Sequence, residues 1–297
     1  MHSHCGIRLR VSKLLFFIFL FTSPFVSCLS LANANNVLIY IRDDVYNDYV
    51  SFVNQRDVLE IKNFSGKSIR RDVVDMIIAQ QALKLGGFTN EFKYSPGKVN
   101  FRNTKMLQEG KLLISFDSYW KSDANELADK LYISSPLIRK GEYVAGVYTS
   151  PQNKKVLKVK TLEGLSKLTA VSTPKWKTDW DTLKSLQLKD LVREDSWLSM
   201  ARMVNLQWVD FMLMPFNGKD DQSFKVRNIH LVPVKNIAIL LKDSRHFVIS
   251  KSHPYGEAAH IAINKGLKIL RSRGTITKAY TEAGFFVQSS QYKILNQ

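Results

Sequence analysis

Short apolar runs alternate with stretches of helical periodicity along most of this chain of 297 residues, and this alternation limits the fold more than any other feature. The first run, Val37–Ile41, has the length and β-branched content of a buried strand. Further on, Ile69, Val73 and Ile77 repeat at helical spacing, and Gly86-Gly87 marks the end of that helix. Such alternation is typical of α/β units with a mainly parallel sheet.

The remaining elements are predicted from the same patterns and from the positions of glycine and proline. Strands are expected near residues 91–94, 111–116, 142–149, 168–172, 208–214, 229–234, 237–241 and 246–250. Helices are expected near residues 68–87, 102–108, 179–186, 196–204, 257–270 and 274–284, with a helical turn at 161–165. The stretch that follows the first strand is interpreted as polar chain with a turn at 63–66.

The first 34 residues have the layout of a secretory signal peptide. A basic start at residues 8–13 precedes an unbroken apolar run at 14–21, and Ala32-Asn33-Ala34 supplies the small-x-small pattern that signal peptidase reads. The apolar run is far shorter than the roughly 20 residues that span a bilayer. We therefore expect a periplasmic protein from which residues 1–34 are removed. The alternative is a buried N-terminal helix.

Both cysteines, Cys5 and Cys28, lie inside this segment. A mature chain without them has no disulfide and no cysteine-ligated metal site. The sequence Phe25-Val26-Ser27-Cys28 also allows a lipid-attachment site with Cys28 as the new N-terminus. Lipoprotein signals usually carry leucine three residues before the cysteine, where this chain has Phe25. We therefore rank a lipid anchor below a free periplasmic protein.

The composition indicates a globular, strongly basic protein. Hydrophobic residues make up 45% of the chain, so a full core can form, and the formal net charge is +17. About 263 residues remain after the first 34 of the 297 are removed, which suits one large domain or two smaller ones. A basic balance can indicate nucleic-acid binding, but an exported protein rarely meets nucleic acid and the basic residues are scattered. A basic surface that faces anionic lipid or an acidic ligand stays open.

Several segments, in their order and spacing, resemble the exported solute-binding proteins of bacterial ABC importers, in the family 3 branch that includes the polar amino acid binders. The matching segments include residues 37–85, 102–110, 134–148, 161–171, 203–210, 247–251 and 266–274. The resemblance implies the type 2 periplasmic binding protein fold, an α/β fold with two lobes. Each lobe is a mainly parallel sheet flanked by helices, and two hinge strands join the lobes.

Carried onto this chain, the resemblance places lobe 1 at residues 35–149 plus 248–297 and lobe 2 at 150–247. A small-molecule ligand would lie in the cleft between the lobes, and the partner would be a membrane permease or a sensor kinase. We expect a monomer that uses no cofactor and no metal and binds no nucleic acid.

Loops that follow strands supply the candidate ligand contacts, because ligands of α/β sheets bind at the carboxyl ends of strands. Each candidate has a plainer interpretation: the aromatic residues could pack inside a lobe, Thr173 could cap a helix, and Arg139 could be an ordinary surface arginine. The candidates on lobe 1 are Tyr46, Asp117, Ser118, Tyr119, Trp120 and Arg139, and those on lobe 2 are Thr173, Trp176 and Phe216.

Two positions depart from the pattern of amino acid binders in the family. Those proteins hold the substrate carboxylate with an arginine where this chain has Leu127, and the substrate ammonium with an acid where it has Pro215. An unpaired buried carboxylate would be costly, so these departures argue against a free α-amino acid as the ligand. Arg139 could replace the missing arginine.

Patterns that would indicate catalysis are sparse. Four histidines, at 230, 246, 253 and 260, lack metal-ligand spacing, and Glu142 with Asp117 is the one acid pair that could be nominated. Structural ion pairing is the plainer interpretation of that pair. We therefore expect a binding protein and no enzyme. The alternatives are a dehydratase-like enzyme on the same fold and an interaction protein whose cleft binds nothing.

Overall fold

The computed structural model describes residues 36–97, 100–287 and 291–297. The predicted signal peptide, both cysteines and the predicted lipid-attachment site lie outside these residues. Within them, no helix is both long enough and apolar enough to cross a membrane.

One α/β unit is built around β1 (Val37–Arg42), which pairs in parallel with β2 (Phe92–Gly97). The predicted first strand is confirmed. The helix α1 (Asp43–Val53) follows at once, where the sequence was interpreted as polar chain, and that prediction is wrong. Its apolar residues Val45, Tyr49 and Phe52 recur every three or four positions and are buried. Three aspartates and other polar residues in the same stretch make this spacing hard to recognise in the sequence. Two aspartates in its first turn favour the helix through its dipole.

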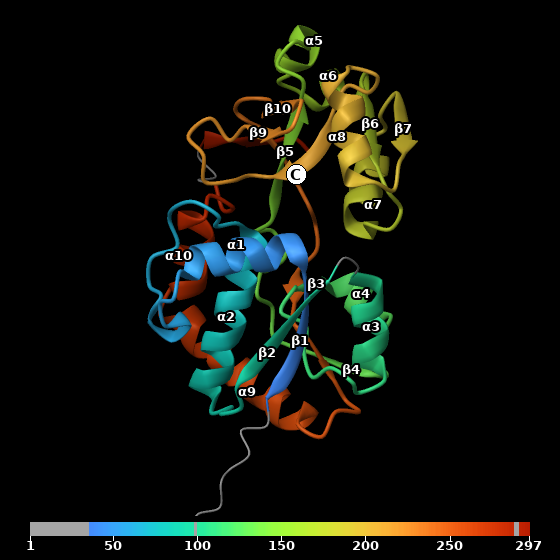
Figure 1. The fold of residues 1–297 in the computed structure, drawn as a ribbon. Coiled ribbons are helices and arrows are strands. Elements are labelled where there is room, and N and C mark those ends of the chain that lie inside the picture. Colours follow the sequence, from blue (N-terminus) through green and yellow to red (C-terminus); the bar gives the residue numbers. More distant parts are fainter. Residues whose placement is uncertain (1–35, 98–99, 288–290) are drawn as a thin grey trace, which may run out of the picture. The chain divides into compact units, whose positions relative to one another are not determined.

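The centre of this unit is the contact between α2 (Arg71–Gly86) and α9 (Gly256–Ser272), which lie side by side in Figure 1. Nearly every residue of α2 from Val73 to Leu83 is buried, so the helix is surrounded by protein. The two backbones meet at two glycines. A Cβ on Gly266 would lie 1.8 Å from the carbonyl oxygen of Ala82, and one on Gly86 would lie 1.9 Å from that of Ala262. Only glycine permits this approach.

Shorter elements complete this part of the chain. These are α3 (Asn100–Gln108), β3 (Tyr119–Trp120), α4 (Lys121–Asn125), β4 (Leu131–Ile133), β12 (Arg245–His246), β13 (Val248–Ser250) and α10 (Thr275–Glu282). Strand β3 pairs antiparallel with β12, and β4 pairs antiparallel with β13.

The predicted strand at 111–116 is wrong as a regular strand. This segment forms one isolated bridge, between Ile114 and Ile249, and two further backbone hydrogen bonds join Ser115 to Val248 and Ser250 to Leu113. Its apolar side chains are nevertheless buried, including Leu113 and Phe116. Burial of apolar surface produced the sequence pattern, and a continuous ladder was not needed for it.

A mixed sheet is centred on β5 (Val144–Thr149). Its antiparallel neighbours are β8 (Met212–Pro215), β10 (Ile229–Pro233) and β11 (Ile237–Leu240). The sheet also contains β9 (Phe224–Val226), which forms a hairpin with β10, and β14 (Lys293–Ile294), which runs parallel to β11.

A second α/β unit is built on the parallel pair β6 (Thr169–Ser172) and β7 (Asp190–Arg193). Its helices are α6 (Leu162–Ser166), α7 (Lys177–Ser185) and α8 (Trp197–Asn205), after the short α5 (Lys154–Leu157). The side chains of Asn153, Thr161 and Ser196 cap α5, α6 and α8. An N-cap of this kind satisfies a backbone N–H that the helix leaves free.

The α/β class is confirmed, but the pairing within it is less parallel than expected. The pairs β1–β2, β6–β7 and β11–β14 are parallel, and the other ladders of the described residues are antiparallel. The strand predicted at 208–214 begins only at Met212, and Trp208 before it is 72% exposed. The positions of the lobe boundaries stay a prediction.

Replacing Gly266 by alanine should lower the free energy of unfolding by about 1–3 kcal/mol, because the added methyl group forces α2 and α9 apart. Gly164, in α6, is the matched control, since a Cβ there meets its nearest atom at 3.3 Å. Urea unfolding of both variants measures the difference. A Gly266→Ala protein as stable as the Gly164→Ala protein would show that the helix crossing is not tight.

Candidate functional site

The N-terminus of α2 presents alternating charges. Arg71 donates a hydrogen bond of 2.7 Å to Asp75 one turn further on, is bonded to the neighbouring Asp72, and lies 3.3 Å from Asp117. The side chains of Arg71 and Asp72 are each 15% exposed. Burial alone would raise the pKa of Asp72, but the arginines at positions 71, 70 and 42 lower it to about 2. Asp72 is therefore a fixed negative charge at neutral pH.

Asp75 is fully buried and accepts hydrogen bonds from three parts of the chain. Besides Arg71, its partners are the hydroxyl of Ser118 at 2.6 Å, the backbone N–H of Ser118 at 3.2 Å, and the hydroxyl of Tyr280 in α10. Burial raises the pKa of Asp75 and outweighs the attraction of Arg71. The same burial raises the pKa of Tyr280, so this phenol stays protonated and donates.

Arg245 reaches the same place from β12. Its Nε donates to the Ser118 hydroxyl at 2.9 Å, and its guanidinium carbon lies 4.7 Å from the ring centroid of Trp120. A nitrogen of the same guanidinium is 3.7 Å from Asp117. We call Arg71, Asp72, Asp75, Asp117 and Arg245 the charged cluster. Two arginines against three aspartates leave it a formal charge of −1.

Asp179, in the first turn of α7, adds a carboxylate to this environment. Its surroundings bury it enough to raise its pKa to about 6, although Arg245 and Arg71 attract it, and Asp123 repels it. Part of its surface remains in contact with water. Asp179 forms no ion pair among the described residues, so its charge is balanced only at longer range. Tyr143, whose ring packs against Trp120 at 4.9 Å, also interacts electrostatically with Asp179.

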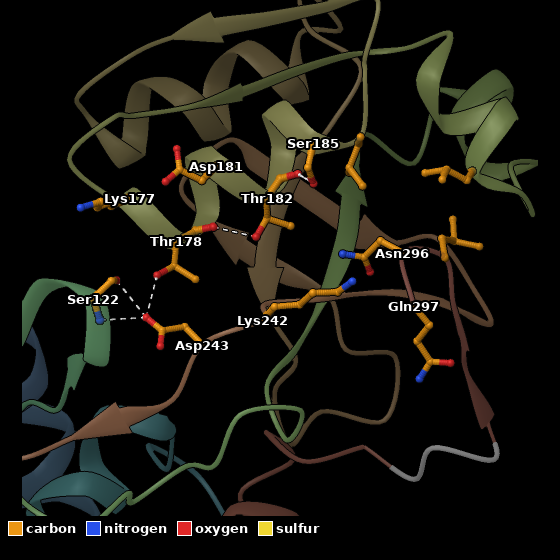
Figure 2. Close-up of a pocket in the computed structure, with 13 residues that line it drawn as sticks. Ser122, Lys177, Thr178, Asp181, Thr182, Ser185, Lys242, Asp243, Asn296 and Gln297 are labelled. Atoms are coloured by element: carbon orange, nitrogen blue, oxygen red, sulfur yellow. Dashed lines mark hydrogen bonds between the residues drawn. The ribbon is translucent and has the colours of Figure 1, made fainter.

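A cavity of about 740 Å³ is lined by residues that are close in sequence to Trp120 and Asp179, among them Ser122 and Thr178 (Figure 2). Asp243 is the polar centre of one wall, because its carboxylate accepts hydrogen bonds from Ser122 N and Oγ at 3.1 and 2.9 Å and from the Thr178 hydroxyl at 3.5 Å. The lining residues are Ser122, Leu162, Lys177, Thr178, Asp181, Thr182, Ser185, Leu186, Lys242, Asp243 and 295–297. Hydroxyl, amide and charged groups line this wall together with a larger share of apolar surface, which suits a molecule with both polar and apolar parts.

The structure brings three of the predicted site residues together. Asp117, Ser118 and Trp120 all contact Arg245. Tyr119 is bonded instead to the Thr104 hydroxyl at 2.9 Å, and burial raises its pKa to about 12. Tyr46 packs with Tyr49 and Tyr94, at ring distances of 6.3 and 5.5 Å.

The other four predicted residues have partners away from the charged cluster. Thr173 donates a hydrogen bond of 2.6 Å to Asp195, and Trp176 packs against the core around β8. Phe216 is 3% exposed and lies between Tyr148 and Tyr292. The side chain of Arg139 forms no hydrogen bond or ion pair among the described residues. Its backbone N–H donates to the Glu142 carboxylate at 2.7 Å, and its carbonyl accepts from the Glu142 N–H at 3.0 Å.

Sequence reasoning missed Arg71, Arg245 and Asp179. Arg71 and Asp75 did carry a signal, a cation and an anion four residues apart at the start of a predicted helix. Nothing local marks Arg245, whose role depends on contacts with residues far away in the chain.

At the two positions where the sequence resemblance places the family anchors, this chain has an apolar contact at Leu127 and an exposed proline at 215. Leu127 packs against the apolar cluster of Leu107, Ala124 and Val248, and Pro215 ends β8. The nominated acid pair is divided: Glu142 pairs with Arg271 at 3.4 Å, whereas Asp117 pairs with Arg71. In the part of the chain that the structure describes, no group of three or more histidine, cysteine, aspartate or glutamate residues could hold a metal ion.

No protein-family model and no curated protein sequence matches this chain. Solved structures do match its fold. One is the probable amino-acid ABC transporter extracellular-binding protein ytmK from Bacillus subtilis, with a TM-score of 0.54 and 13% identity over 84% of this chain and 98% of that one. Another is substrate-binding domain 2 of GlnP from Lactococcus lactis, with a TM-score of 0.51 and 13% identity over 85% and 96% of the two chains.

A third is the periplasmic VFT2 domain of BvgS from Bordetella pertussis, with a TM-score of 0.53 and 12% identity over 70% of this chain and 83% of that one. At such identities the likeness shows the fold alone. This chain has the two-lobed type 2 periplasmic binding protein fold, as the sequence resemblance implied.

Replacing Asp75 by alanine should lower the free energy of unfolding by about 3–5 kcal/mol, because Arg71 loses a buried partner and two hydroxyls lose their acceptor. Asp44 is the control, since its side chain is 59% exposed and its ion pairs with Arg42 and Arg70 are worth at most about 1 kcal/mol. Chemical unfolding monitored by circular dichroism compares the variants. An equal loss of unfolding free energy in the Asp75→Ala and Asp44→Ala proteins would contradict the central role of Asp75.

Proposed function

We propose that this protein is exported through cleavage after residue 34 and binds a small solute for an ABC permease or a membrane sensor. The two-lobed fold supports solute binding, because hinged lobes can close around a ligand so that contacts from both sides add together. The structural likeness to a transporter's binding protein and to the periplasmic domain of BvgS supports either partner. The proposed lobes are residues 35–149 plus 248–297 and residues 150–247.

We place the ligand between the charged cluster and Asp179, with Asp117 and Trp120 as further contacts. The observation that carries this assignment is the excess of carboxylates. The cluster has a formal charge of −1, and Asp179 and Asp123 add two acids that form no ion pair among the described residues. Burial raises the pKa of both acids by more than the surrounding cations lower it.

A ligand with an ammonium or guanidinium group would supply that cation. The arginines of the cluster are already engaged by its aspartates, by Ser118 and by Trp120, so an added carboxylate would find no free cation there. This arrangement fits the replacement of both family anchors by Leu127 and Pro215. The proposed ligand class is therefore organic cations, such as amines and guanidines without an α-carboxylate.

A thermal-shift screen that includes amines, guanidines, amino acids, sugars and organic acids tests this assignment, because a ligand that binds the folded protein raises its melting temperature. Amines or guanidines should give the largest shifts. Asp179→Asn should then weaken a confirmed hit at least tenfold, through loss of a buried charge partner. Lys242→Ala, which changes the cavity wall of Figure 2, should leave the affinity unchanged. If Lys242→Ala weakened binding and Asp179→Asn did not, the ligand would be assigned to the cavity of Figure 2 instead.

The affinity for such a cation should rise about tenfold between pH 5 and pH 7, because Asp179 with a pKa of about 6 is mostly neutral at the lower pH and mostly ionised at the higher one. Titration calorimetry across this range, with a ligand whose own charge is constant, measures the effect. The Asp179→Asn protein should show a flat profile. A wild-type profile that is equally flat would contradict the role of Asp179.

A further inference from the structure

The most exposed large apolar side chain of the described residues is Trp208, at 72%. It follows the C-terminus of α8, where Gln207 takes a positive φ of 60° and the Trp208 N–H bonds back to the Met203 carbonyl. In this type of helix end the residue at the position of Trp208 usually packs back on the helix. Here it points to water, with Leu206 beside it at 48% exposure.

The β9–β10 hairpin lies next to this helix end. Asn205 fixes the contact, since its side chain donates to the Asn228 carbonyl at 3.4 Å and accepts from the His230 N–H at 2.9 Å. Helix α8 also packs against β10 of the hairpin. The hairpin turn brings Val226, at 38% exposure, to the same surface. These hydrogen bonds anchor the hairpin, which carries Val226, beside the helix end that carries Leu206 and Trp208.

Basic side chains surround these apolar residues. Arg202, Lys225 and Arg227 are all exposed, and none of them forms an ion pair among the described residues. No acidic residue occurs in 202–208 or in 224–230. We call this surface the tryptophan patch. It consists of Arg202, Leu206, Trp208, Lys225, Val226 and Arg227.

We propose that the tryptophan patch binds the surface of an anionic phospholipid membrane. Tryptophan prefers the boundary between lipid and water, and apolar residues combined with unpaired lysine and arginine bind anionic lipid both by insertion and by charge. Without Arg8, Arg10 and Lys13 of the predicted signal peptide, the net charge of +17 becomes +14, and it adds a long-range attraction to such a surface. A protein partner with a mixed surface fits less well, because the patch has three basic side chains and no carboxylate of its own to pair with the partner's basic groups.

Co-sedimentation of the exported, purified protein with vesicles tests the proposal. Wild-type protein should bind vesicles of equimolar phosphatidylglycerol and phosphatidylcholine, should not bind phosphatidylcholine alone, and should be released by salt. Trp208→Ala should weaken binding about tenfold, through loss of a large inserted side chain. Ile261→Ala is the matched control, since Ile261 is 60% exposed on α9, and it should bind as wild type does.

The charge contribution needs its own comparison. The triple variant Arg202→Gln, Lys225→Gln, Arg227→Asn should bind roughly a hundredfold more weakly, at about fivefold for each charge. Asparagine is chosen at 227 because it tolerates the φ of 51° found there. A control triple, Lys84→Gln, Lys93→Gln, Lys265→Gln, removes equal charge from exposed residues elsewhere and should bind within about twofold of wild type. Equal losses in the two triple variants would overturn the proposal.

Fluorescence identifies the residue that enters the membrane. Vesicles with brominated acyl chains should quench the wild-type emission, and Trp208→Phe should keep the binding but lose the quenching. Quenching that persists in Trp208→Phe would assign insertion to another tryptophan and overturn the proposal. Sedimentation velocity without vesicles detects self-association. A dimer that Trp208→Ala abolishes would show that a second copy of the chain covers the patch, and the membrane proposal would be wrong.

Discussion

The buried carboxylate of Asp75 is the interaction on which the arrangement around the candidate site depends. It accepts hydrogen bonds from α2 itself, from the backbone and side chain of Ser118, and from Tyr280 in α10. A fully buried charge is tolerable only when such bonds replace water, so these partners fix its place. Because Ser118 is held in this way, Arg245 and Trp120 are held as well, and the site is assembled from the inside outward.

The charge balance of the site follows from the same constraint. Arg71 forms its closest ion pairs with Asp72 and Asp75. Asp117 therefore has a longer contact with Arg71, at 3.3 Å, and Asp179 has no ion pair among the described residues. A site arranged for an acidic group would need a cation with free donors, and the cluster has engaged its own. In the site that we propose, the interaction that stabilises the fold therefore also favours a cationic ligand. The absence of an arginine at Leu127 is consistent with that bias.

Most regular elements could be predicted, because their apolar spacing reflects burial on one face or on all sides. Prediction failed at two segments. The apolar segment at 111–116 is buried but does not form a continuous strand ladder. In α1, the polar and acidic residues around the buried apolar positions obscure their helical spacing. The loop around Ser118 was found because it follows buried chain. Arg245 was not, because its partners lie far away in sequence, and single-sequence patterns carry no information about such contacts.

The net positive charge of the chain and the acidic groups near the charged cluster act over different distances. Charges beyond about 8 Å are screened at physiological ionic strength. The net charge, +17 for the full sequence and +14 without Arg8, Arg10 and Lys13, therefore acts on large anionic surfaces, where many fixed charges are met at once. A small solute near the charged cluster interacts instead with the nearest groups, which have a net negative formal charge and are mostly buried from water. The two proposals are therefore compatible: a chain that is basic overall can be drawn to anionic lipid at the tryptophan patch and still prefer a cation between the charged cluster and Asp179.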